Sequence, residues 1–89
     1  MHYTYLLKLK NGQIYTGSTS NLKRRFAEHA HGRVASTINY LPAKIILYEA
    51  YVLKSDAERR EKYLKTTEGK RFLRQQIRDY LKTEIIMGL

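Results

Sequence analysis

Four residues with chemically useful side chains recur at regular intervals in the first third of the chain. Tyr5, Tyr15, Arg25 and His29 are separated by ten, ten and four positions. On two paired strands and a following helix, this spacing can bring two phenols, a guanidinium and an imidazole onto one small surface. A guanidinium fork binds two phosphate oxygens, and phenols and imidazoles transfer protons. The combination therefore indicates chemistry on a phosphate.

Each of these residues also has an ordinary structural interpretation. Tyrosines in strands are usually packing residues, and a histidine beside an apolar stripe is usually a half-buried residue with satisfied hydrogen bonds. In the functional interpretation, cations such as Arg25 favour the charged form of a phenol whose pKa is ~10 in water. Tyr5 or Tyr15 would then orient water or take a proton from it. His29, one turn beyond Arg25, would contact the phosphate or carry the proton.

Glu61 is a carboxylate on the helix face that it shares with Ala57 and Leu64. An acid pointing toward the interior needs a cationic partner. One candidate is an ion pair with Arg60, Arg25 or another basic residue. The other is a divalent metal, Mg²⁺ or Mn²⁺, held by one carboxylate, water and a substrate phosphate. The spacing of His and Asp offers no cage for Zn²⁺.

The elements that must position these groups begin with a hairpin around Asn11-Gly12. A two-residue loop would place Tyr5 and Tyr15 on opposite faces of the sheet. A three-residue loop, Lys10-Asn11-Gly12, with Gly12 left-handed, pairs Leu7 with Tyr15 and Tyr5 with Gly17. The tyrosines then lie on one face, and we predict this second arrangement.

A helix is predicted from Asn21 to about His31, ended by Gly32. Leu22, Phe26 and His29 form its apolar stripe, with Arg25 at the edge. The stretch 33–43 is expected to be a loop, and the apolar, β-rich residues 44–51 a third strand. The fold class is therefore α+β, a three-stranded antiparallel sheet flanked by helices.

Two further helical stretches follow the third strand. The sequence Ser55-Asp56-Ala57-Glu58 predicts a capping box that opens a helix to about Lys65. A second stretch restarts at 66–68 and continues with apolar residues at helical spacing (Phe72, Leu73, Gln76, Ile77, Tyr80 and Leu81). The C-terminal segment 85–89 is apolar and is compatible with docking on the domain or on another chain.

Composition places the chain among small basic domains. Its 89 residues predict a single domain, 1–89, and the absence of cysteine fits a reducing cytoplasm. We expect a cytoplasmic protein without a membrane association, because the N-terminus lacks a signal-peptide pattern and no apolar run is long enough to span a bilayer. A formal charge of +9 favours nucleic acid as the partner. A generally solvated basic surface explains the same charge.

Taken together, these residues resemble the GIY-YIG endonuclease superfamily, and most closely its small stand-alone bacterial proteins. Tyr3-Thr4-Tyr5 aligns with the Gly-Ile-Tyr motif and Tyr15-Thr16-Gly17 with the Tyr-Ile-Gly motif. Arg25, His29 and Glu61 match the family's arginine, its histidine-or-tyrosine position and its metal-binding glutamate. Tyr3 stands in place of the motif glycine, and an asparagine that some members carry has no counterpart that we can place.

The resemblance implies metal-dependent hydrolysis of a phosphodiester, with Glu61 holding Mg²⁺ or Mn²⁺ and with Tyr5, Tyr15, Arg25 and His29 in the catalytic site. DNA is the expected substrate ahead of RNA, and the same module is the cutting domain of an excision-repair nuclease subunit, which connects it with DNA repair. A lone cutting module is expected to recognise structure or to take its specificity from a protein partner. The alternative is a catalytically inactive nucleic-acid-binding module with the same fold. A role in protein interaction or at a membrane surface is a third interpretation.

Overall fold

The computed structural model describes the backbone of residues 1–87 and the side chains of residues 1–84. The elements within these residues are, in order, β1 (His2–Lys8), β2 (Ile14–Thr19), α1 (Leu22–Ala30), the 3₁₀ turn η1 (Ile38–Tyr40), β3 (Lys44–Tyr51), α2 (Lys54–Leu64), α3 (Thr67–Gln76) and α4 (Arg78–Met87). The strands form one antiparallel sheet in the order β2-β1-β3. The predicted α+β class and third strand are confirmed.

The hairpin between β1 and β2 has the predicted three-residue loop. Leu7 pairs with Tyr15 and Tyr5 pairs with Gly17. Gly12 has a φ of 88°, the left-handed conformation that glycine adopts without steric cost. The loop is closed by a 2.9 Å hydrogen bond from the Leu9 amide to the carbonyl of Gln13. This register places Tyr5 and Tyr15 on the same face of the sheet.

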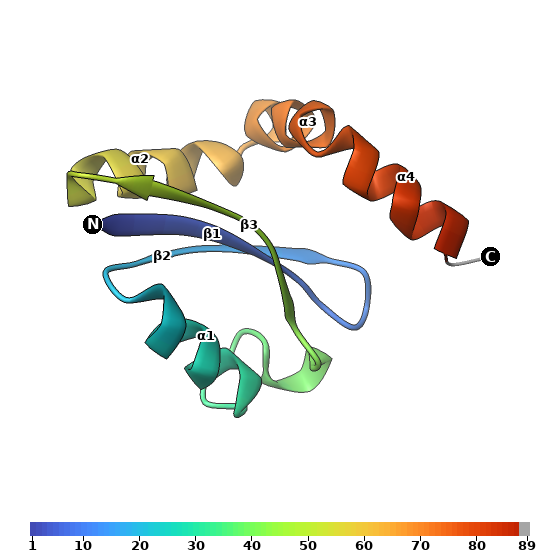
Figure 1. Ribbon diagram of the computed structural model, residues 1–89, viewed down its shortest axis with the longest axis horizontal. Helices are drawn as coiled ribbons and strands as arrows, with labels where there is room; N and C mark the ends of the chain where they lie inside the picture. The colour runs from blue at the N-terminus through green and yellow to red at the C-terminus, as the bar shows by residue number, and fades with distance from the viewer. Residues whose placement is uncertain (88–89) are drawn as a thin grey trace.

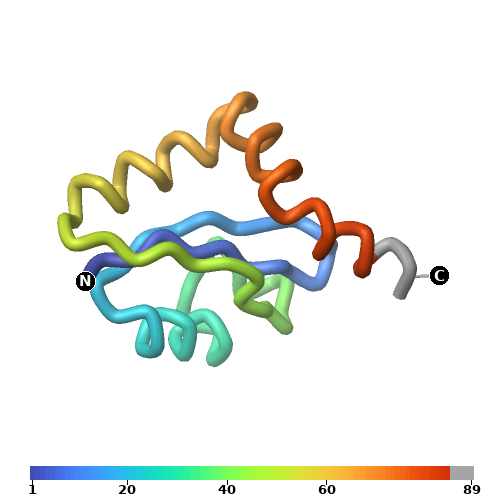
Figure 2. The backbone as a smooth tube through the Cα atoms, turned by 45° about the horizontal axis from the view of Figure 1, so that its top comes forward, coloured from blue at the N-terminus to red at the C-terminus, as the bar shows by residue number. Residues whose placement is uncertain are grey.

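The sheet lies between two layers of helix (Figure 1 and Figure 2). Helix α1 covers one face, over a core built on Tyr5, Leu7 and Leu9. Helices α2 and α3 cover the other face, over Leu6, Leu64 and Leu73. Strand β1 runs through the middle and contributes to both cores, so its side chains alternate between two buried environments.

A bulge in β3 supports this two-sided packing. The register of β1 with β3 shifts between Leu6 and Leu7, so that Leu6 opposes Leu47 and Leu7 opposes Ile45. Ile46 is the extra residue. Ile46 and Leu47 both pack in the core beneath α2 and α3, whereas Ile45 packs beneath α1.

Helix α1 begins and ends where its sequence predicts. Asn21 is the N-cap, and its side-chain oxygen accepts a 3.0 Å hydrogen bond from the Arg24 amide. Gly32 follows the helix with a φ of 72°. Such a left-handed glycine terminates many helices. The cap fixes where α1 starts, and therefore which of its side chains face the sheet.

The capping box predicted at Ser55 is wrong. Helix α2 begins one residue earlier, at Lys54, and its N-cap Leu53 has no side chain that can accept a hydrogen bond. Ser55 therefore lies inside the first turn. Thr66 does cap α3, since its hydroxyl accepts a 3.0 Å hydrogen bond from the Gly69 amide. The predicted helical stretch after Thr66 is broken at Ile77, which separates α3 from α4.

The predicted docking of residues 85–89 lies outside the residues whose side chains the structure describes. Among the helices that it does describe, none combines the length and the apolar composition needed to cross a membrane.

Candidate active site

Tyr5, Tyr15 and His29 form an aromatic cluster between the hairpin and α1. The ring centroids of Tyr5 and Tyr15 are 6.2 Å apart, and that of His29 lies 5.7 Å from Tyr5 and 5.0 Å from Tyr15. Tyr5 is only 1% exposed, whereas Tyr15 is half-buried. Tyr15 is therefore the more accessible of the two phenols.

Gly17 makes room for the Tyr5 ring. The two residues are partners across the β1–β2 pair, and a Cβ atom at Gly17 would lie 2.6 Å from the Tyr5 hydroxyl oxygen. A real side chain does not tolerate such a contact. The glycine two residues after Tyr15 is thus required by the close approach of the Tyr5 phenol.

His29 is fully buried, and each of its ring nitrogens has a partner. Nε2 lies 2.8 Å from the Tyr5 hydroxyl, and Nδ1 lies 2.9 Å from the Thr37 hydroxyl. Thr37 directs its own proton toward the Val34 carbonyl at 3.5 Å, so its oxygen accepts from Nδ1–H. This network assigns the neutral tautomer of His29 in which Nδ1 carries the hydrogen and Nε2 accepts a hydrogen bond from the Tyr5 hydroxyl.

The surroundings keep His29 neutral. Burial lowers its pKa, and the positive charge of Arg25 acts in the same direction. The predicted direct contact between His29 and a phosphate does not fit a side chain with no exposed surface. Its geometry fits the other predicted role, in which the imidazole exchanges a proton, here through the Tyr5 hydroxyl.

Arg25 lies beside the two phenols and is partly exposed to solvent. Its side chain is 36% exposed and forms a 3.2 Å ion pair with Glu28, one turn along α1. The neighbouring Tyr5 oxygen raises the pKa of Arg25, so the guanidinium is permanently charged. An exposed pair of this kind contributes only about 0.3–0.5 kcal/mol. The fork is therefore free to exchange Glu28 for an anionic ligand.

The protonation of Tyr5 differs from the sequence-based expectation. Burial raises the pKa of Tyr5 to about 12, and the opposite effect of Arg25 is the smaller of the two. Tyr5 is thus a neutral phenol at physiological pH. Its hydroxyl donates a hydrogen bond to Nε2 of His29, and Tyr5 is not a preformed phenolate.

Glu61 lies on α2, on the other side of the edge strand β2. Its Oε1 accepts a 2.7 Å hydrogen bond from the Ser18 hydroxyl, and its Oε2 forms a 2.8 Å ion pair with Lys65. Burial favours a higher pKa, but Lys65 and Ser18 together hold the pKa of Glu61 below its usual value. Of the partners that the sequence offered, Arg60 pairs with Glu49 and Arg25 with Glu28, so the predicted ion pair is made by another basic residue, Lys65. The carboxylate is ionised and 21% exposed.

The edge strand connects the two halves of the candidate site. Gly17 lies against Tyr5 on one face of β2, and the next residue, Ser18, holds Glu61 on the other. Successive strand residues point to opposite faces. Within the described residues β2 is an edge strand, in the order β2-β1-β3, so no further strand lies beyond it at this side of the sheet.

Glu61 suits a magnesium-type ion better than a zinc-type ion. Within the described residues, no group of three or more His, Cys, Asp or Glu side chains could hold a metal. Mg²⁺ needs fewer protein ligands, since it keeps several waters and binds one or two carboxylates together with substrate phosphates. Lys65 is 56% exposed, and an exposed i,i+4 pair contributes about 0.3–0.5 kcal/mol. The ammonium group of Lys65 therefore holds Oε2 of Glu61 only weakly.

Thr37 and Ser18 were not identified from the sequence as site residues. Thr37 lies in the loop predicted at 33–43, where polar residues are common. The available signal was weak, since a threonine eight positions after His29 has no fixed geometry in a loop. Ser18 lies near the end of the return strand of the hairpin and begins a run of residues that favour helix N-caps, and neither feature predicts a role in a site. Its position directly after the Tyr15-Thr16-Gly17 motif places it opposite the tyrosine face.

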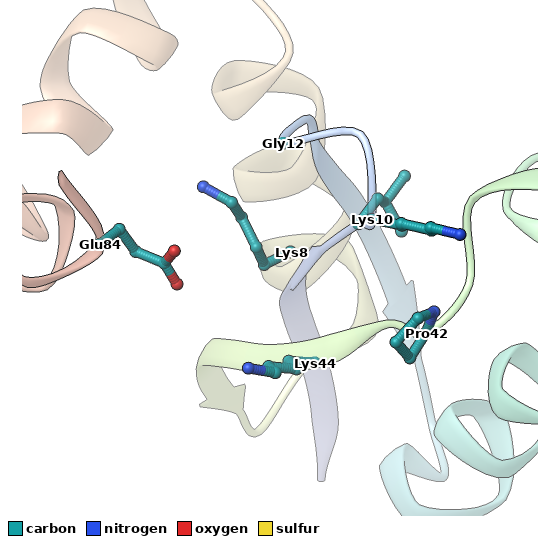
Figure 3. Close-up of a pocket in the computed structure, with 7 residues that line it drawn as sticks. Lys8, Lys10, Gly12, Pro42, Lys44 and Glu84 are labelled. Carbon is teal, nitrogen blue, oxygen red and sulfur yellow. The ribbon is translucent and has the colours of Figure 1, made fainter. Parts of the chain in front are cut away.

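A separate basic pocket of 530 Å³ lies at the hairpin end of the sheet. Lys8 and Lys44 are paired across β1 and β3, and Lys10 also lines the pocket. Figure 3 shows Lys8 and Lys44 extending to the same side, toward Glu84, while Lys10 points away. Like charges directly opposite one another are destabilising, so an anion between them would be stabilising.

Comparisons with known proteins agree with this geometry. A family model described as the GIY-YIG catalytic domain matches residues 1–75. The UPF0213 protein of Clostridium perfringens is 39% identical over 66 residues, which are 73% of this chain and 71% of that protein. The UPF0213 protein of Staphylococcus haemolyticus is 40% identical over 66 residues, 73% of this chain and 80% of that protein.

A solved structure gives the same result. The solution NMR structure of a UPF0213 protein from Bacillus halodurans matches with a TM-score of 0.55 and 32% identity, over 84% of this chain and 83% of that one. The family model spans most of the chain, including all five predicted site residues. The chain therefore belongs to the GIY-YIG family of nuclease domains, among the UPF0213 proteins.

Proposed function

We propose that this protein is an endonuclease that hydrolyses phosphodiester bonds of DNA with the help of Mg²⁺ or Mn²⁺. The observation that carries the proposal is the buried chain of hydrogen bonds from Tyr5 to His29 to Thr37 beside the charged Arg25. A structural core does not require a neutral imidazole that is ready to accept a proton next to a permanently charged guanidinium.

Arg25 binds the scissile phosphate in this mechanism. Its fork matches two non-bridging oxygens, and its charge compensates the negative charge that develops during attack. The Glu28 carboxylate, which holds the fork in the free protein, is exchanged for the phosphate. Pre-positioning by Glu28 keeps the guanidinium beside the phenols.

The two phenols and His29 remove the proton from the attacking water. Tyr15 is the accessible phenol and accepts the proton from water as it passes its own to Tyr5. Tyr5 passes its proton to Nε2 of His29, with which it is already hydrogen-bonded at 2.8 Å. Hydroxide attacks phosphorus, the bond from phosphorus to the leaving deoxyribose oxygen breaks, and that oxygen takes a proton from solvent. The imidazolium then returns its proton to solvent by the same route.

Glu61 would be the protein ligand of the metal, and water molecules would complete the coordination on the protein side. A bound Mg²⁺ supplies charge neutralisation at the phosphate. The Ser18 hydroxyl orients the carboxylate through Oε1. Oε2 is then the oxygen at which a metal would replace the ammonium group of Lys65. The basic pocket at Lys8, Lys10 and Lys44 gives the nucleic-acid backbone a second point of attachment.

The ion pair between Lys65 and Glu61 favours a second candidate, a binding module that does not cut. Both candidates predict salt-sensitive binding to nucleic acid, so binding does not separate them. The separating experiment incubates the purified protein with flapped, branched, nicked and fully paired DNA, and with RNA of matched sequence. Cleavage that requires Mg²⁺ or Mn²⁺ and stops with EDTA supports the nuclease. Binding without cleavage of any substrate in either metal supports the binding module.

A further inference from the structure

A groove of 520 Å³ lies on the α1 face of the sheet, beside the first turns of α1. Its lining includes the aromatic residues Tyr3, Tyr48 and Phe26, together with Leu22. The candidate mechanism uses none of these side chains. The groove is therefore a concave, aromatic surface without a role in the reaction described above.

Tyr48 is open to solvent although its partner on the central strand is buried. It is the direct β3 partner of the buried Tyr5, so the two side chains share a face. Tyr5 is 1% exposed, but Tyr48 is 56% exposed. Tyr3 contacts Tyr48 edge-to-face, with ring centroids 6.2 Å apart. This contact supports the Tyr48 ring from one side while more than half of its surface stays open to solvent.

The groove is close to the candidate active site. Tyr3 precedes Tyr5 by two residues on the same strand and face, which corresponds to roughly 7 Å along the strand. Leu22 and Phe26 come from α1, the helix that carries Arg25 and His29. A nucleotide next to the scissile phosphate can therefore place its base in this groove.

The charge around the groove favours an anionic occupant. Lys23 contributes to its lining, and the first turn of α1 has no acidic residue. An apolar peptide or a second copy of this basic chain would gain nothing from this positive charge. A nucleotide combines a flat aromatic base with a negative backbone and so matches both features of the groove. Within a duplex the faces of each base are covered by its neighbours, so only an unpaired, unstacked base can enter.

We infer that this groove binds an unpaired nucleobase adjacent to the scissile phosphate, and that DNA with a single-stranded segment is the preferred substrate. The inference deepens the proposed nuclease function and rests on it for the position of the scissile phosphate. Stacking of a base on an aromatic side chain is worth about 1–3 kcal/mol. A loss of that size weakens binding about 5- to 150-fold.

The test measures binding without cleavage. Glu61→Gln protein, in EDTA and low salt, is titrated into a short single-stranded oligonucleotide that carries 2-aminopurine, whose fluorescence is quenched when it stacks. We expect quenching on binding, and about 5- to 150-fold weaker affinity with loss of quenching in Glu61→Gln/Tyr48→Ala. Tyr48→Phe in the same background keeps the ring and should retain both. Tyr40→Ala, at an exposed tyrosine on η1, is the matched control and should change neither.

The groove and the nuclease function can fail separately. Unchanged affinity and quenching in the Tyr48→Ala protein would overturn the base-binding role of the groove, even if the wild-type protein cuts DNA. Equal affinity for paired and single-stranded DNA would overturn it as well, as would a Tyr48→Ala effect confined to self-association. Quenching that depends on Tyr48 in a protein that never cuts would instead support the groove and reject the nuclease.

Discussion

The Tyr5 hydroxyl occupies the space where a side chain at Gly17 would begin, 2.6 Å from the position of its Cβ atom. This contact joins the two tyrosine motifs, because the glycine of the second motif accommodates the phenol of the first. It also aims the Tyr5 hydroxyl at Nε2 of His29.

Gly17→Ala should displace the Tyr5 hydroxyl from His29. We expect a loss of about 1–3 kcal/mol in the free energy of unfolding, as for other overpacked sites, together with slower cleavage. Urea denaturation and single-turnover cleavage measure the two effects. Gly12→Ala is the control, because a Cβ atom there meets nothing within 4 Å and only the left-handed backbone is strained. Cleavage by Gly17→Ala at the wild-type rate would contradict the close-packing argument.

Thr37→Val should remove the hydrogen bond that fixes the tautomer of His29. The substitution keeps the shape of the side chain but removes the oxygen that accepts from Nδ1–H. An unpaired buried donor costs about 1–3 kcal/mol of stability. Nitrogen-15 NMR of the imidazole should show the change of tautomer, and cleavage should slow. Thr37→Ser restores the hydroxyl and should restore the wild-type spectrum. An unaltered imidazole spectrum in Thr37→Val would remove Thr37 from the site.

The buried neutral state of His29 predicts a specific dependence of stability on pH. Burial lowers its folded pKa below the ordinary value of 6.5, so the unfolded chain binds the proton more tightly. The stabilising contribution is complete above pH 6.5. It falls with a limiting slope of about 1.4 kcal/mol per pH unit below that value, until the pH reaches the folded pKa. The free energy of unfolding, measured with urea between pH 5 and 8, should show this loss in the wild-type protein. His29→Gln cannot titrate and should not show it.

Lys65→Gln should make metal binding tighter. The ammonium group competes with a cation for Oε2 of Glu61, and its removal leaves that oxygen accessible. The Mg²⁺ concentration that gives half-maximal cleavage should therefore decrease. Lys54→Gln, at an exposed lysine on the same helix, is the matched control. A higher metal requirement in Lys65→Gln would indicate that Lys65 supports the site.

The parts of this fold that follow local rules could be predicted from the sequence. The Asn11-Gly12 sequence located the hairpin, and the choice of a three-residue loop placed both tyrosines on one face. Asn21 and Gly32 marked the ends of α1. The start of α2 was misplaced because Leu53 occupies the N-cap without a polar side chain. Local chemistry at Ser55 was a poor guide where tertiary packing set the boundary.

The site was harder to predict, because its properties depend on burial. Sequence spacing brought Tyr5 and Arg25 together, but it did not reveal that burial outweighs the cation and raises the phenol pKa to about 12. The contact between Thr37 and His29 crosses a loop of irregular backbone, for which no periodicity exists. The sequence did not show which basic residue pairs with Glu61. Arg60 pairs with Glu49 instead, which leaves Lys65 as the partner of Glu61.

The most direct test of the account is the single-turnover rate of Mg²⁺-dependent cleavage of a flapped DNA by the wild-type, Glu61→Gln and Arg25→Lys proteins. Glu58→Gln and Arg24→Lys, which are exposed neighbours on the same helices, serve as controls. We predict a decrease of about 10²–10³ for the two site variants, and the wild-type rate for both controls. Equal rates for Glu61→Gln and the wild-type protein, or no cleavage by the wild-type protein, would contradict a hydrolytic site at this edge of the sheet.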